Sequence, residues 1–70
     1  MLDPFIVDVS KSGVDFINTE VRKSVYFQPG DDAAAFMREL EDYRDTFTEL
    51  TDQEVLYKIW LQYDHIAEEF

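Results

Sequence analysis

Sixteen carboxylates are the most numerous residues in this 70-residue chain that could do acid–base or metal chemistry. His65 is the only histidine, so a metal site or proton relay built on two imidazoles cannot form within one chain. Adjacent acids occur at Asp31–Asp32 and at Glu68–Glu69, where paired carboxylates could exchange a proton or hold calcium. Among sixteen acidic residues such pairs are expected by chance, and the calcium-loop spacing with its central glycine is absent. We therefore predict no metal site and no catalytic carboxylate pair.

Residue types that other enzymes depend on are scarce as well. The chain has no cysteine, which excludes disulfides, thiolate catalysis and structural zinc fingers. Gly13 and Gly30 are the only glycines and are far apart, so no glycine-rich phosphate loop exists. The sequence predicts a protein that is not an enzyme and carries no cofactor.

The net charge of −10 is concentrated in the second half of the chain. Residues 1–30 hold four acids and three bases, whereas residues 31–70 hold twelve acids and three bases, a net charge of −9. Such an excess opposes direct binding to nucleic acid or to anionic lipid. Residues 1–4 do not resemble the start of a signal peptide, and no apolar run is long enough to span a membrane. We expect a cytoplasmic protein with a basic protein as its partner.

Apolar residues alternate with a period of two through residues 1–28, which predicts a three-stranded antiparallel meander. We expect a four-residue loop at 10–13, a turn at 18–20 and a third strand that begins at Val21. One face of this sheet would collect Phe5, Val7, Val9, Val14, Phe16, Val25 and Phe27. That face needs a cover, because three strands alone would leave it in water.

Two amphipathic helices follow and supply the cover. The first is expected over 32–47, with Asp31 or Asp32 as N-cap. Its apolar stripe contains Phe36, Leu40, Tyr43 and Phe47. Thr51 and Glu54 form a capping-box pattern that begins a second helix, expected to run to about Glu68. Its core stripe contains Val55, Leu56, Ile59, Tyr63, Ile66 and Phe70, with Trp60 and Ala67 on the flank. The sequence thus predicts one α+β domain over 1–70, a β-meander (1–28) followed by an acidic two-helix hairpin (31–70) packed on one face (βββαα).

The outer face of the second predicted helix carries a candidate binding epitope. Tyr57 and Leu61 point away from the core stripe, among charged residues, as an apolar centre within a charged rim. Asp64 and Glu68 would repel each other at helical spacing, and Glu68 and Glu69 would lie at the negative end of the helix. A cationic partner would relieve these costs. The alternative is that the last turn frays and its charges serve only solubility.

We therefore predict a partner-binding surface that combines acids of both helices with the two outward apolar residues. Its members are Glu41, Asp42, Asp45, Glu54, Tyr57, Leu61, Asp64, Glu68 and Glu69.

Two functions fit this surface. Carboxylates at i and i+4 recur about every 6 Å along a helix, a spacing comparable to that of neighbouring backbone phosphates. This predicts an inhibitor that blocks a basic, nucleic-acid-binding protein by mimicking DNA or RNA. In size, charge and lack of catalytic residues the sequence resembles small acidic proteins of phages and mobile elements, among them anti-CRISPR and anti-restriction inhibitors. The resemblance implies action in a host-cell cytoplasm. The alternative is an antitoxin-like or regulatory adaptor that buries Tyr57 and Leu61 in a partner or in a second copy, as a homodimer.

Overall fold

The computed structural model describes residues 3–70, so the signal-peptide prediction falls partly on residues 1 and 2, outside this range. The elements, in order along the sequence, are β1 (Phe5–Ser10), β2 (Gly13–Asn18), β3 (Lys23–Phe27), α1 (Asp31–Thr46), α2 (Asp52–Tyr63), the 3₁₀ helix η1 (Asp64–Ile66) and β4 (Glu68–Glu69). The predicted α+β fold and the order βββαα are confirmed, and β4 is an addition to them. Neither of the two long helices in this range has the length and apolar character needed to cross a membrane.

The strands form one antiparallel sheet in the order β1-β2-β3-β4. Val7, Phe16 and Val25 lie opposite one another in a single cross-strand row, on the one face that the alternation predicted for them. Because side chains alternate between faces, this register collects the predicted apolar residues on the inner face. Of these residues only Val9, at the far end of the edge strand, is exposed (60%), while Val7 and Phe27 are partly buried.

Both connections between the strands differ from their predicted form. Ser10 pairs with Gly13, so the first loop has two residues instead of four. Gly13 has a φ of 128°, and a Cβ at this position would lie 2.4 Å from the Phe27 carbonyl oxygen, so only glycine fits. Val21 lies in the next loop and not in the third strand. The Asn18 side chain accepts a hydrogen bond from the Glu20 N–H (3.0 Å), which starts this loop and delays β3 to Lys23.

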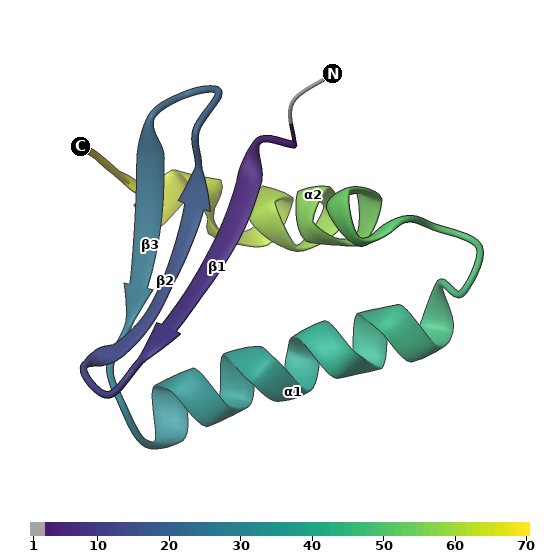
Figure 1. The fold of residues 1–70 in the computed structure, drawn as a ribbon, viewed down its shortest axis with the longest axis horizontal. Helices are drawn as coiled ribbons and strands as arrows, with labels where there is room; N and C mark the ends of the chain where they lie inside the picture. The colour runs from purple at the N-terminus through teal and green to yellow at the C-terminus, as the bar shows by residue number, and fades with distance from the viewer. Residues whose placement is uncertain (1–2) are drawn as a thin grey trace.

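Both helices pack on the inner face of the sheet (Figure 1). Phe16 of β2 contacts Phe36 of α1 and Trp60 of α2, with ring centroids 5.2 and 5.3 Å apart. The two helices run in opposite directions, as predicted for a hairpin, and the second half of α1 extends past the sheet (Figure 1). Trp60, predicted on the flank, is 5% exposed and lies in the core. Because the Phe16 ring of β2 contacts both α1 and α2, the two helices cover the same face of the sheet.

The helix starts follow two different capping modes. Gly30 is the N-cap of α1 and makes no side-chain cap bond, so the prediction of Asp31 or Asp32 as N-cap is wrong. Both acids lie instead in the first turn, where they meet the positive end of the helix dipole. The capping box of α2 is confirmed: Thr51 Oγ1 accepts from the Glu54 N–H (3.2 Å), and the Glu54 carboxylate accepts from the Thr51 N–H (2.9 Å).

The C-terminal segment is not helical, so the prediction that the second helix reaches Glu68 is wrong. It ends at Tyr63, and after η1 the backbone turns to pair Glu68 with Ser24 and Glu69 with Lys23. Strand pairing uses the free edge of β3 and places Glu69 opposite a lysine, whereas a longer helix would have placed both glutamates at its negative end. Ile66 and Phe70, predicted for the core, are 55% and 60% exposed.

Candidate protein-binding groove

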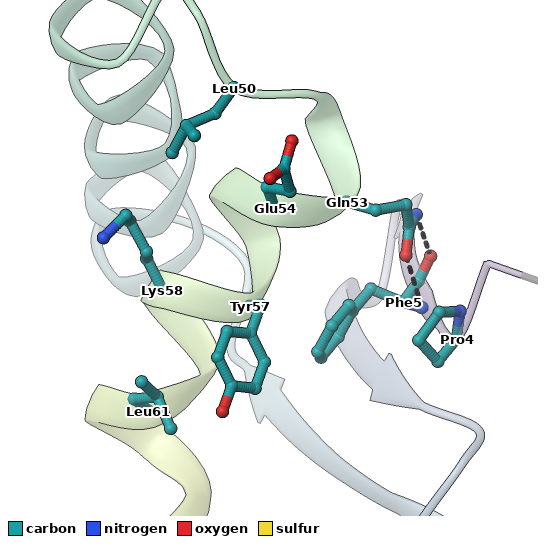
Figure 2. Close-up of a pocket in the computed structure, with 8 residues that line it drawn as sticks. All are labelled: Pro4, Phe5, Leu50, Gln53, Glu54, Tyr57, Lys58 and Leu61. Atoms are coloured by element: carbon teal, nitrogen blue, oxygen red, sulfur yellow. Dashed lines mark hydrogen bonds between the residues drawn. The ribbon is translucent and has the colours of Figure 1, made fainter.

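A groove lies between the start of β1 and the outward face of α2 (Figure 2). Its volume is about 410 Å³, and we call it the β1–α2 groove. Its lining residues are Pro4, Phe5, Leu50, Gln53, Glu54, Tyr57, Lys58 and Leu61. The predicted residues Glu54, Tyr57 and Leu61 come together here.

The apolar surface of the groove is formed chiefly by Tyr57 and Leu61. The two side chains are one helical turn apart and are 53% and 54% exposed, so the core leaves about half of each uncovered. Phe5 is buried beside them, and its ring centroid lies 6.2 Å from that of Tyr57. Figure 2 shows Tyr57 and Leu61 projecting from the same side of α2. A partner residue placed here would meet aromatic and aliphatic surface.

The amide and the two charged side chains that line the groove are already engaged within the protein. The Gln53 amide bonds the backbone of Phe5, and the Glu54 carboxylate accepts from the Thr51 N–H. The Lys58 ammonium lies 5.0 Å from the centroid of the Phe47 ring, on the side of α1. The groove therefore favours an apolar residue of a partner over a polar ligand.

Gln53 also fixes the position of β1 against α2. Its Oε1 accepts from the Phe5 N–H and its Nε2 donates to the Phe5 carbonyl, both at 3.0 Å (Figure 2). These bonds hold Phe5, and with it one wall of the groove, against the first turn of α2.

The remaining predicted partner-binding residues are exposed but lie elsewhere. Glu41, Asp42 and Asp45 are on α1, Asp64 is in η1, and Glu68 and Glu69 form β4. Glu41 lines a hollow on α1 with Met37, and Glu68 lines another with residues of β3. Because Glu68 and Glu69 belong to a strand, their expected crowding at a helix end and the helical repulsion of Glu68 by Asp64 do not occur. The structure does not gather the nine predicted residues into one site.

Sequence reasoning left five of the eight lining residues out of the predicted surface, Lys58 among them. It assigned Phe5 only to the core and gave no role to Pro4, Leu50 or Gln53. The contact between Gln53 and Phe5 joins residues 48 positions apart, and no periodic pattern marks it. Leu50 precedes the capping box, a position where an apolar residue often packs on the helix start, and this was the one available signal.

The described residues contain no candidate metal site. No group of three or more histidine, aspartate or glutamate side chains within residues 3–70 converges as metal ligands. His65 is exposed on η1. Comparison with protein-family models, curated proteins and solved structures gives no match to this protein.

Proposed function

We propose that this protein is a non-catalytic binding protein that holds a basic partner protein through the β1–α2 groove. The observation that carries the proposal is the pair Tyr57 and Leu61, half exposed beside Phe5 in a groove whose amide and charged side chains are already engaged. Burying such side chains contributes free energy in proportion to the apolar area covered. Tyrosine in particular is enriched among residues that dominate binding energy.

The charge supports a basic partner. The net charge of −10 creates a field that attracts cationic proteins and repels acidic ones before contact. Apart from Glu54 the exposed acids lie outside the groove lining, so they act on the rate of association more than on the anchored contact. Affinity from the groove should therefore persist at high salt, whereas the association rate should fall.

Affinity capture from a host lysate tests this function. The substitution Tyr57→Ala should weaken retention of the partner by about 1–2 kcal/mol, about 5- to 30-fold, at low and at high salt. Tyr26→Ala is the matched control, because Tyr26 is also 53% exposed but lies on the opposite face of the sheet. It should leave retention unchanged. Equal retention by wild type and Tyr57→Ala, with both folded by thermal melting, would show that the groove is not the interface.

Mimicry of DNA or RNA by α1 is the second candidate. Glu41, Asp42 and Asp45 are all exposed on this helix, and its second half extends beyond the sheet (Figure 1). A projecting acidic helix could enter a basic channel that normally holds a nucleic acid backbone. This function predicts displacement of nucleic acid from the partner, and loss of displacement when the three acids are reversed in charge.

A further inference from the structure

Strand β1 has a free edge, because it is the first strand of the sheet and pairs only with β2. In an antiparallel ladder, successive residues direct their N–H and C=O groups alternately toward and away from the neighbour strand. The Pro4 carbonyl accepts from the Thr19 N–H (2.8 Å), on the β2 side, whereas both backbone polar groups of Phe5 point outward to Gln53. The same alternation directs the N–H and C=O groups of Val7 and Val9 outward.

These outward groups are open to a further strand. Gln53 bonds the outward N–H and C=O groups of Phe5. Within residues 3–70, no residue bonds the outward N–H and C=O groups of Val7 or Val9. Val9 is also 60% exposed. An apolar, unpaired edge of this kind is a template for strand addition.

The negative charge of Asp8 beside this edge favours a basic strand as the binding partner. Asp8 lies between the two valines and directly opposite Asp15 of β2, a like-charge pair that costs stability. A strand added beside β1 would place one residue next to Asp8, and a lysine or arginine there would relieve the repulsion. A second copy of this protein is disfavoured, because it would bring its own Asp8 and a net charge of −10.

We propose that the edge of β1 and the β1–α2 groove form one continuous site for an extended segment of the partner in which apolar residues alternate with lysine or arginine. The segment adds as a strand along Val7 and Val9. It leaves the sheet at Phe5, where Gln53 occupies the backbone groups, and enters the groove, where one of its apolar residues packs against Tyr57 and Leu61. The proposal rests on the proposed function and specifies its ligand.

A fluorescently labelled synthetic peptide in which valine alternates with lysine, ending in leucine, is the probe. On binding, the amide protons of Val7 and Val9 should exchange with solvent at least about tenfold more slowly, because they gain strand hydrogen bonds. Val9→Pro removes one outward N–H without removing a bond to β2, and proline is tolerated at such edge positions. This variant should weaken binding by about tenfold or more, whereas Val9→Thr, which keeps the N–H, should bind as wild type does.

Two peptides with methylated amides repeat the test on the unaltered protein, in case Val9→Pro fails to fold. Methylation of the amides that face β1 should abolish binding, and methylation of the alternate amides, which face solvent, should not. Strand addition would be overturned if both methylated peptides bind equally, or if amide exchange at Val7 and Val9 is unchanged. It would also be overturned if the unmethylated probe does not bind at low salt. A dimer of the protein that Val9→Pro dissociates would also overturn it, because the occupant would be a second copy.

The failure of this proposal is separable from failure of the proposed function. If Tyr57→Ala weakens capture of the partner while both methylated peptides bind equally, the groove remains the interface and only the added strand is wrong. If capture of the partner is insensitive to Tyr57→Ala, the proposed function itself is wrong.

Discussion

The Gln53 side chain takes the place of a neighbouring strand at Phe5. It accepts from the backbone N–H and donates to the backbone carbonyl of that residue, each at 3.0 Å, as the C=O and N–H of one residue in an added antiparallel strand would. A residue in the first turn of α2 thus closes the start of the edge strand β1. This pair joins β1 to α2 and forms one wall of the β1–α2 groove.

Removing the Gln53 side chain should therefore destabilise the fold. We expect Gln53→Ala to lower the free energy of unfolding by about 1–3 kcal/mol, because both partly buried backbone groups of Phe5 lose their partner. Urea denaturation measures the change. Gln28→Ala is the control, since Gln28 is exposed and its side chain makes no hydrogen bond within residues 3–70. If the two variants unfold at the same urea concentration, the Gln53 contacts contribute nothing to stability.

The capping box of α2 should make stability depend on acidic pH. The Thr51 backbone N–H, which donates to the Glu54 carboxylate, and the Thr51 side chain lower the pKa of Glu54. The folded protein thus binds this proton more weakly than the unfolded protein does. The charged carboxylate stabilises the fold above the ordinary glutamate pKa, and this contribution is lost as the pH falls through the lowered value.

Glu54→Gln tests this dependence, because glutamine keeps an acceptor oxygen for the Thr51 N–H but does not titrate. Its melting temperature should fall less steeply in acid than that of the wild type. Glu49→Gln, which removes an exposed acid of the preceding loop, is the matched control. Identical slopes for wild type and Glu54→Gln would contradict the assigned cause of the pKa shift.

Tyr63 should make stability depend on alkaline pH. Burial, together with the hydrogen bond that its hydroxyl donates to Glu39 Oε1 (2.9 Å) and the charge of Glu39, raises the pKa of Tyr63 to about 12. The unfolded protein loses this proton near the ordinary tyrosine value of about 10. The protonated Tyr63 hydroxyl therefore contributes its full stabilisation of the fold below about pH 10, and this stabilisation is lost as the pH rises through about 12. In urea titrations the stability of Tyr63→Phe should depend less on alkaline pH than that of the wild type, and Tyr57→Phe, on the exposed face of α2, is the matched control.

The elements that the sequence predicts correctly are those set by local periodicity. Alternation placed Phe16 and Val25 on the inner face, and the helical stripe placed Phe36 and Ile59 in the core, because each pattern depends on neighbours in the sequence. The outward position of Tyr57 followed from the same helical geometry. Three strands and two helices could be predicted in this way.

The wrong predictions concern residues whose structure is set by contact with a segment distant in the sequence and not by the local pattern. Tyr63, Ile66 and Phe70 fit one helical stripe, but the free edge of β3 offered Glu68 and Glu69 backbone partners that a helix end could not. The groove has the same origin, since its walls come from segments about 50 residues apart. Periodicity carries no information about which segments meet.

Charge on α1 should control association with a basic partner. Replacing Glu41, Asp42 and Asp45 by lysine raises the charge by two units at each position, from −10 to −4. All three side chains are exposed and none makes a hydrogen bond or ion pair within the described range, so the fold should be retained. We expect the association rate at low salt to fall by about tenfold or more, and the difference from wild type to shrink at high salt. Stopped-flow mixing with the captured partner measures both.

A second triple variant separates the position of the charge from its amount. Lysine at Asp3, Glu20 and Glu49 gives the same net charge of −4 from exposed sites outside α1. If α1 mimics a nucleic acid backbone, only the α1 variant should lose the ability to displace labelled DNA or RNA from the partner, because displacement requires acids inside the basic channel. Equal losses in both variants would mean that the overall field steers association and that α1 occupies no channel. Full displacement by the α1 variant would leave the β1–α2 groove as the surface on which binding depends.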